Sequence, residues 1–242
     1  MTHPLVYCSH TGSALKFTAP ELQAHGIPVV DHPTPEVTHL LLDIPTRKVP
    51  EGLLERLPDR ITVVGGNLDF PELQGYQTLD LLQNDEYLAI NAGITADCAL
   101  RVAVQRMETT FRDTPTLVIG WGRIGKCLCQ LLHSLHVPVT VAARKENDRA
   151  ILQALGFRTA DPAHLADLSQ YRLIFNTAPS PVLNRKQLAN CTNCIKIDLA
   201  SVPGLEVEDV IWARGLPGIY APESSGRLIA EIFMKRCKED YP

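Results

Sequence analysis

The chain has 242 residues, a formal net charge of −4 and 45% hydrophobic residues, as expected for a globular protein of one large or two small domains. This charge argues against a general nucleic-acid-binding protein, whose surface must be basic to contact phosphates. No apolar run of about 18 residues predicts a membrane span, and the start carries no signal-peptide pattern. The 7 scattered cysteines indicate reduced thiols in a cytoplasmic protein.

The first half of the chain predicts a small, flavodoxin-like α/β domain. Apolar runs predict strands at residues 5–9, 39–43 and 61–66, with shorter extended pieces at 27–30 and 76–82. Residues 94–111 have apolar side chains at helical spacing, with Thr95 as the expected N-cap. This helix should run from the first domain into the second. We therefore expect domains at 1–110 and 111–242.

The second half alternates strands and helices more regularly. Strands are predicted at 116–120, 138–144, 172–178 and 194–201, with a short one at 157–159. The predicted helices are 123–136, 147–155, 163–168, 184–189 and, after a stretch broken by two prolines, about 223–238. Nearly continuous apolar strands that alternate with helices indicate a doubly wound parallel sheet of the Rossmann type. The last helix is expected to pack back on the first domain.

A glycine turn follows the first strand of this second domain. Gly120, Gly122 and Gly125 form G-x-G-x-x-G between an apolar strand and a helix. In dinucleotide-binding domains the first glycine permits the turn, the second lets the pyrophosphate approach and the third allows close helix–strand packing. The helix N-terminus then offers N–H groups to the phosphates. The pattern predicts a dinucleotide site, and the alternative is a tight turn without a ligand.

The next strand bears on which dinucleotide is bound. NAD sites place an acidic residue about 20 positions after the glycines, where it binds the ribose 2′-hydroxyl. Here the strand ends with Ala143, Arg144 and Lys145, without a carboxylate. A guanidinium can bind a 2′-phosphate through two hydrogen bonds. We therefore predict NADP(H), with an ordinary solvated basic pair as the alternative.

Two further strand ends should border the cofactor, because ligands of open α/β sheets lie beyond the carboxyl ends of the strands. Asp198 could equally be a structural carboxylate that caps a neighbouring turn. The predicted cofactor-binding residues are Gly120, Trp121, Gly122, Arg123, Ile124, Gly125, Ala143, Arg144, Lys145, Asn176, Thr177, Ala178, Pro179, Asp198, Leu199 and Ala200.

Cys191 and Cys194 have the spacing of a zinc-binding pair. A structural zinc site needs four ligands, usually two such pairs, and no second pair of this spacing is present. Cys127 and Cys129 lie on the predicted helix after the glycine turn, whose inner face should be core. We therefore predict no metal site.

Six segments occur in the same order as the matching motifs of one family. They are NAGITADCALRVAVQ, VIGWGRIGK, VAAR, IFNTAP, IDLASVPG and GLPGIYAPESSGRLIAEI. On these segments the chain resembles the family of the A subunit of dipicolinate synthase, known from spore-forming bacteria. The resemblance runs from about residue 61 to 231, whereas the first 35 residues match poorly. Glu223 stands where the family usually has a lysine, and residues 94–98 also depart from its pattern.

The resemblance implies an oxidoreductase with an N-terminal α/β domain and a Rossmann domain similar to those of 2-hydroxyacid dehydrogenases. It implies NADP-dependent formation of pyridine-2,6-dicarboxylate from a cyclic intermediate of the lysine (diaminopimelate) pathway during sporulation. The small dicarboxylate substrate should occupy the interdomain cleft. A homo- or hetero-oligomer and a second, flavoprotein-like subunit are also implied. The alternative is a non-catalytic NADP-binding subunit or a nucleotide-responsive interaction module.

No catalytic acid or base stands out, and the His–Glu–Arg set of 2-hydroxyacid dehydrogenases is not recognisable. His10 could act as a general base, because its ordinary pKa suits neutral pH. A surface histidine in a turn is the alternative. Thr95, Ser224 and Ser225 could bind substrate carboxylates. Weaker candidates, each with an ordinary role as a turn or cap residue, are Ser9, Thr11, Gly12, Ser13, Asn67 and Asn91.

Overall fold

The computed structural model describes residues 4–9, 12–165 and 167–240. The chain forms two compact units, the first built from Met1–Asn91 and Pro217–Pro242 and the second from Ala92–Leu216. We expected the boundary near residue 110, at the end of a connecting helix. The division instead lies within helix α2 (Asp85–Val104), which continues through it without a break.

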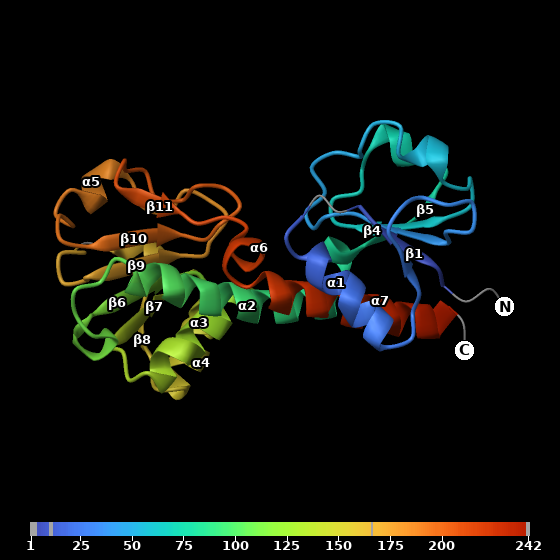
Figure 1. The fold of residues 1–242 in the computed structure, drawn as a ribbon. Coiled ribbons are helices and arrows are strands. Elements are labelled where there is room, and N and C mark those ends of the chain that lie inside the picture. The colour runs from blue at the N-terminus through green and yellow to red at the C-terminus, as the bar shows by residue number, and fades with distance from the viewer. Residues whose placement is uncertain (1–3, 10–11, 166, 241–242) are drawn as a thin grey trace. The chain divides into compact units, whose positions relative to one another are not determined.

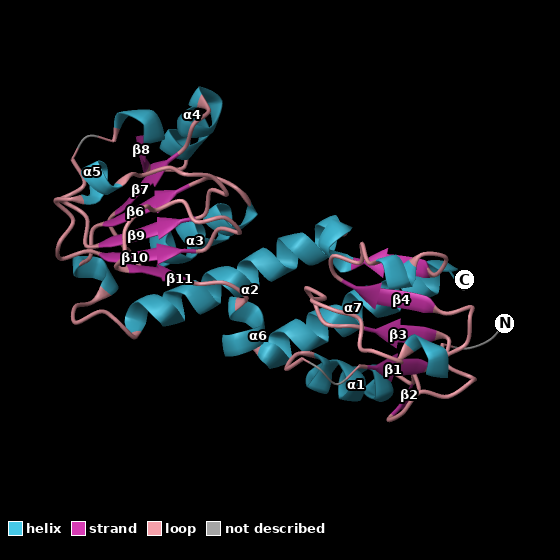
Figure 2. Ribbon diagram, turned by 90° about the horizontal axis from the view of Figure 1, so that it is seen from above, coloured by secondary structure: helices cyan, strands magenta, loops and turns pink. Residues whose placement is uncertain are grey.

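The first unit contains a five-stranded parallel sheet (Figure 2). The strand order β2-β1-β3-β4-β5 is that of flavodoxin-like domains. Apolar residues of the central strands, among them Leu40 and Val63, are fully buried in one hydrophobic cluster. The strands are β1 (Val6–Cys8), β2 (Val29–Val30), β3 (His39–Leu41), β4 (Thr62–Gly65) and β5 (Gln77–Asp80).

Two helices far apart in the sequence pack together in the first unit. They are α1 (Leu15–Ala24) and α7 (Pro222–Asp240), which lie side by side in Figure 1. The Thr18 hydroxyl donates to the Gly226 carbonyl at 3.1 Å, which ties the two helices together. The sequence did not predict α1, because Pro20 lies inside it and its apolar pattern is weak.

Helix α2 begins at Asp85, before the predicted start. The prediction of Thr95 as its N-cap is therefore wrong, since Thr95 lies within the helix and is buried. Asn91 and Gly93 concealed the first half of the helix, because both residues have low helix propensity. By length and composition α2 could cross a membrane, but 44% of its most apolar stretch is buried in the protein. Core helices of soluble proteins often have this composition.

The second unit contains a six-stranded parallel sheet in the order β11-β10-β9-β6-β7-β8, which Figure 2 shows from one edge to the other. This is the Rossmann order. The chain adds β7 and β8 on one side of β6, and β9, β10 and β11 on the other, so the strand order reverses between β6 and β9 although all strands are parallel. The prediction of two parallel-sheet α/β domains is thus confirmed. The strands are β6 (Thr116–Ile119), β7 (Val139–Ala142), β8 (Arg158–Ala160), β9 (Leu173–Asn176), β10 (Ile195–Asp198) and β11 (Val210–Trp212).

The helices predicted at 123–136, 147–155 and 184–189 are present in this unit, whereas α6 was not predicted. Helix α3 buries Gly125, Leu128, Cys129 and Leu132, a spacing that places one apolar face on the sheet. The segment broken by Pro217 contains β11 and then α6, with the proline in the first turn of α6, where it is tolerated. The helices are α3 (Arg123–Ser134), α4 (Glu146–Ala154), α5 (Arg185–Leu188) and α6 (Leu216–Tyr220), the last spanning the division between the units.

Short 3₁₀ turns occupy several connections. The helix predicted at 163–168 is wrong in its described part, where Pro162–His164 forms only such a turn. Asp161 precedes it and accepts a hydrogen bond from the Ala163 amide, which favours a tight turn over a longer helix. The 3₁₀ turns are η1 (Leu54–Arg56), η2 (Pro71–Leu73), η3 (Leu81–Gln83), η4 (Phe111–Asp113) and η5 (Pro162–His164).

Candidate cofactor site

The glycine turn joins β6 to α3 and is held by close packing at two of its three glycines. Gly120 has φ of +104°, and a Cβ there would lie 2.4 Å from Thr177 Oγ1. A Cβ on Gly125 would lie 2.3 Å from the Gly120 carbonyl oxygen. Larger side chains would therefore disturb the fold itself at both positions. These two glycines are explained without any ligand.

Gly122, the middle glycine, is different. Its φ of −81° is open to any residue, and a Cβ there would meet no atom within 4 Å. Gly122 also forms the N-cap of α3, so the free N–H groups of the first helical turn follow directly. The fold alone does not require glycine here. Open space beside helix N–H groups is what a phosphate needs to approach the backbone.

A cavity of about 260 Å³ adjoins this turn at the point where the strand order reverses. Ligands of open α/β sheets bind at such a point. Nine of the predicted cofactor residues line the cavity, and five lining residues were not predicted. The predicted ones are Gly120, Trp121, Gly122, Ala143, Arg144, Lys145, Thr177, Ala178 and Pro179. The others are Ile119, Ala142, Asp148, Pro162 and Val182.

The remaining predicted cofactor residues do not line this cavity. They are Arg123, Ile124, Gly125, Asn176, Asp198, Leu199 and Ala200. The first three belong to α3, where Gly125 serves helix–strand packing. The other four lie at the ends of β9 and β10, where Asp198 and Asn176 have a structural role instead.

Asp198 and Asn176 are fully buried and hydrogen-bonded to each other, with Asn176 Nδ2 donating to Asp198 Oδ1 at 3.0 Å. Asp198 also accepts from the amides of Ala200, Gly204 and Leu205 at 2.7–3.2 Å. Buried carboxylates must be satisfied in this way. The two side chains therefore shape the loops after β9 and β10. Of the two interpretations of Asp198, its contacts favour the structural one.

Two cationic side chains and one carboxylate lie together at the end of β7. Arg144 and Lys145 are exposed and line the cavity. Asp148, in the first turn of α4, lines it as well. Arg149 Nη1 donates to the carbonyls of Ala143 and Arg144, each at 2.7 Å. The sequence analysis missed Asp148 and Arg149, because no motif marks them. They lie near the end of β7 only because α4 begins shortly after it.

Trp121 lines the cavity, and its ring contacts two residues that do not line it. Its ring lies edge-on to Phe157, with centroids 6.3 Å apart, and the Lys126 ammonium lies 5.9 Å from its centroid. The indole is thus held beside the glycine turn. Its fluorescence should report on a ligand in the cavity.

The candidate residues of the first unit that the structure describes lie in different local settings. His10 and Thr11 lie outside the described residues. The Ser13 hydroxyl donates to the Gly218 carbonyl at 2.5 Å, and a Cβ on Gly12 would overlap the Asp43 carboxylate. Ser9 is buried at the end of β1, and Asn67 has a left-handed φ of 59° in a turn. Asn91 lies inside α2, as Thr95 does.

The two serines at the start of α7 have different surroundings. Ser225 is buried, and its hydroxyl donates to the Ala221 carbonyl at 3.1 Å. Ser224 is exposed. Glu223, where the resembled family has lysine, lies 2.8 Å from Arg227, whose Nε is 3.6 Å from Glu21. Ser224 is thus the more accessible of the two serines, and Glu223 has a cationic partner within its own helix.

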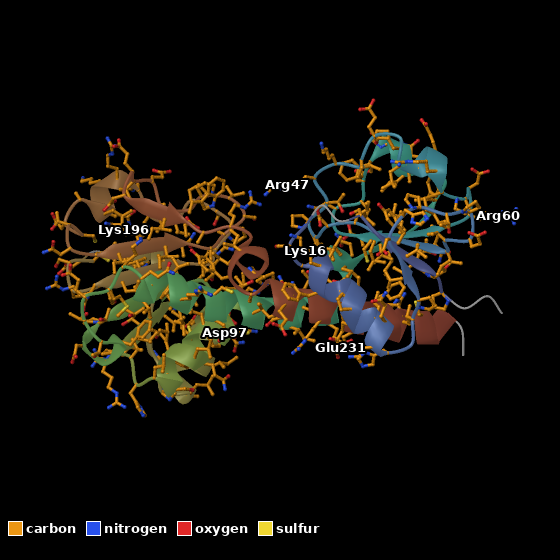
Figure 3. All side chains as sticks on the ribbon, in the orientation of Figure 1. Lys16, Arg47, Arg60, Asp97, Lys196 and Glu231 are labelled. Carbon is orange, nitrogen blue, oxygen red and sulfur yellow. The ribbon has the colours of Figure 1, made fainter. Side chains whose placement is uncertain are left out.

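The Cys191–Cys194 segment surrounds a buried lysine. Lys196, labelled in Figure 3, is 2% exposed and donates to the carbonyls of Cys191 and Cys194 at 2.9 and 3.2 Å. Its ammonium also pairs with Asp209 at 2.6 Å. Burial raises the pKa of the Cys194 thiol to about 12, whereas zinc binds the thiolate. Within the described parts of the chain, no group of three or more His, Cys, Asp or Glu residues could hold a metal.

Comparison with known proteins confirms the resemblance inferred from the motifs. The chain is 28% identical over 172 residues to the dipicolinate synthase A subunit of Bacillus subtilis. The match covers 66% of this chain and 57% of that protein, so a large part of the relative has no counterpart in the alignment. No protein-family profile matches the chain.

Solved structures show the same fold. The crystal structure of the dipicolinate synthase A chain from Bacillus subtilis has a TM-score of 0.81 at 20% identity, over 99% of this chain and 97% of that one. An NAD-complexed D-isomer specific 2-hydroxyacid dehydrogenase from Lactobacillus delbrueckii has a TM-score of 0.54 at 10% identity, over 98% of this chain and 97% of that one. Their common architecture is the pair of parallel-sheet α/β domains.

Proposed function

We propose that this chain is an NADP-dependent oxidoreductase of the dipicolinate synthase type. The observation that carries the proposal is Gly122, a glycine that the fold does not require, beside an open cavity at the switch point of a Rossmann sheet. The similarity to the dipicolinate synthase A subunit, together with the likeness to dehydrogenase folds, supports a nicotinamide cofactor and an oxidoreductase role. The choice of NADP and the identity of the substrate are the proposed parts.

The chain's own residues would bind and orient the cofactor. The glycine turn and the first turn of α3 present N–H groups to the pyrophosphate. Arg144 and Lys145 provide positive charge for a 2′-phosphate. When bound, the nicotinamide ring supplies the hydride acceptor. Asp148 lines the same cavity, and its negative charge would oppose a 2′-phosphate and so reduce the preference for NADP.

The proposed product is pyridine-2,6-dicarboxylate, formed from a cyclic intermediate of the lysine pathway. Aromatisation favours this oxidation, so the protein mainly has to place the ring and bind two carboxylates. Ser224, exposed in the first turn of α7, is the accessible candidate for a carboxylate contact. We also propose a cytoplasmic setting, which suits a chain with several buried thiols, and a flavoprotein-like partner subunit.

A non-catalytic NADP-binding subunit is the second candidate. The positions of two predicted catalytic residues favour it. Thr95 is buried within α2, and the Ser225 hydroxyl donates to the Ala221 carbonyl. Neither hydroxyl is placed as an obvious catalytic acid or base. In this case the cofactor would bind, and turnover would depend entirely on the partner.

Cofactor binding can be measured through Trp121. The chain has 2 tryptophans, so the Trp212→Phe variant leaves Trp121 as the single reporter. We expect NADPH to quench its fluorescence and to bind more tightly than NADH. Arg144→Ala should reduce this preference, and Arg158→Ala, at an exposed arginine outside the cavity, should not. Tighter NADH binding, or an unchanged preference in Arg144→Ala, would contradict the choice of NADP.

Turnover separates the two candidates. The purified chain is mixed with NADP and freshly generated lysine-pathway intermediate, with and without the flavoprotein partner, and pyridine dicarboxylate absorbance is followed. Product from the chain alone supports the enzyme. Product that forms only when the partner is present supports the non-catalytic binding subunit. Cofactor binding without product in either mixture contradicts both candidates and supports a nucleotide-responsive interaction module.

A further inference from the structure

The segment that carries Arg144 is fixed by a single side chain from the following helix. Arg149 Nη1 donates to the carbonyls of both Ala143 and Arg144 at 2.7 Å. One guanidinium nitrogen therefore holds two consecutive peptide groups between β7 and α4. Charge-assisted hydrogen bonds of this length are among the stronger polar contacts in proteins.

The same nitrogen of Arg149 also has an acidic neighbour. Asp161 is the residue directly after β8, and its Oδ2 lies 3.6 Å from Arg149 Nη1. Asp161 is fixed in turn, because its Oδ1 accepts a hydrogen bond from the Ala163 amide at 3.0 Å. The Ala143 amide donates to the Ala160 carbonyl at 3.1 Å, which joins the same two strand ends through the backbone. Arg149 thus connects the ends of β7 and β8.

Arg149 does not itself line the cavity, and its side chain is only 22% exposed. Several residues close to Arg149 in the sequence or next to its partner Asp161 do line the cavity. Arg144, Lys145 and Asp148 line one wall, and Pro162, next to Asp161, lines it as well. Arg149 therefore lies behind the wall and holds its backbone in place.

We propose that Arg149 is a positioning residue for NADP recognition, because it fixes the backbone from which Arg144 reaches the 2′-phosphate. This inference rests on the proposed cofactor function. An exposed arginine on an unrestrained turn would lose side-chain and backbone freedom on binding, and fixing the backbone beforehand reduces this cost. Loss of Arg149 should therefore weaken NADPH binding and leave NADH binding nearly unchanged.

The test is a double-mutant cycle measured by calorimetric titration of NADPH and NADH. In Arg149→Met the ratio of the NADH to the NADPH dissociation constant should fall roughly ten-fold, which corresponds to about 1.4 kcal/mol. In an Arg144→Met background the same change should have no further effect on the ratio, since Arg149 acts through Arg144. Arg158→Met, at an exposed arginine on β8 outside the cavity, is the matched control and should leave the ratio unchanged.

A second variant guards against misfolding. Arg149→Lys keeps the charge but not the fork of donors, so the ratio should fall by a smaller factor with the melting temperature nearly retained. An unchanged ratio in both Arg149 variants, or an equal loss of both cofactors, overturns the inference and leaves the proposed function intact. If the unaltered chain binds neither cofactor, or prefers NADH, the proposed function fails as well.

Discussion

Gly122 and Gly125 lie three residues apart in one motif, yet the structure assigns them different physical roles. Alanine at Gly122 meets no protein atom, so the free energy of unfolding should fall by no more than about 1 kcal/mol, the cost of a poorer N-cap. Its methyl group would occupy the approach to the helix N-terminus. We expect NADPH affinity to fall at least roughly ten-fold, a loss of about 1.4 kcal/mol of binding free energy.

The control is Gly125→Ala, whose Cβ would lie 2.3 Å from the Gly120 carbonyl oxygen. This variant should lose folding stability first, measured as a lower midpoint in urea. If Gly122→Ala binds NADPH as tightly as the unaltered chain does, the glycine turn is not the pyrophosphate site.

Asp148 offers a second test at the scale of single residues. Its carboxylate shares a cavity wall with Arg144 and would repel a 2′-phosphate. Asp148→Asn should tighten NADPH binding by a factor of about five, as expected for one partly screened charge pair. NADH affinity should stay the same or fall, because the carboxylate can accept a hydrogen bond from a ribose hydroxyl.

Glu146→Gln removes a charge from the same helical turn but outside the cavity lining, so it controls for the helix dipole. Equal effects of the two substitutions on NADPH affinity would show that Asp148 acts only through general electrostatics.

At the scale of elements, the contact of α1 with α7 depends on Gly226. A Cβ there would lie 2.4 Å from the Ala14 carbonyl oxygen and 2.7 Å from Phe17 Cβ. Alanine would gain about 1 kcal/mol of helix propensity, but overpacking costs typically about 1–3 kcal/mol. We expect a net loss of unfolding free energy in Gly226→Ala, measured by urea denaturation.

Gly93 in α2 provides the opposite case within the same chain. A Cβ there would meet no atom within 4 Å, so Gly93→Ala should raise the free energy of unfolding by roughly 0.5–1 kcal/mol. Stabilisation by both substitutions would mean that α1 and α7 do not pack as closely as the structure shows.

The sequence predicted strands better than helices, for a physical reason. Strands of a parallel sheet are buried on both faces and read as continuous apolar runs, as β6 and β9 do. Helix α1 contains Pro20 and the first half of α2 contains Asn91 and Gly93, so packing overrides local propensity there. Local pattern cannot reveal such helices.

The candidate site was predictable only in part. The glycine motif and the end of β7 identified Gly120, Gly122 and Arg144, all of which line the cavity. Pro162 and Val182 reach the same cavity from segments distant in sequence, and no motif marks them. Asn176 and Asp198 were predicted to bind the cofactor but do not line the cavity. A polar residue at a strand end predicts a position, but not whether its side chain faces a ligand or a neighbouring loop, as these two do.

For the whole molecule, the division into two units predicts where a cofactor should stabilise the chain. All residues that line the proposed cofactor cavity belong to the second unit. NADPH at 100 times its dissociation constant should stabilise the unit that binds it by about 2.7 kcal/mol. Hydrogen-exchange mass spectrometry should therefore show slower exchange in β6, β7 and β9, with β1, β3 and β4 unchanged. Equal protection of both sheets would contradict a site confined to the second unit.

The return of the chain to its first unit has a consequence for biosynthesis. Pro217–Pro242 belongs to the same unit as Met1–Asn91. The contact between α1 and α7 can therefore form only after α7 has been synthesised. The ribosome therefore releases the Rossmann sheet before the first sheet can gain its last helix. During translation the first sheet therefore remains without the helix that packs on α1, whereas the second sheet has all its strands as soon as β11 has emerged.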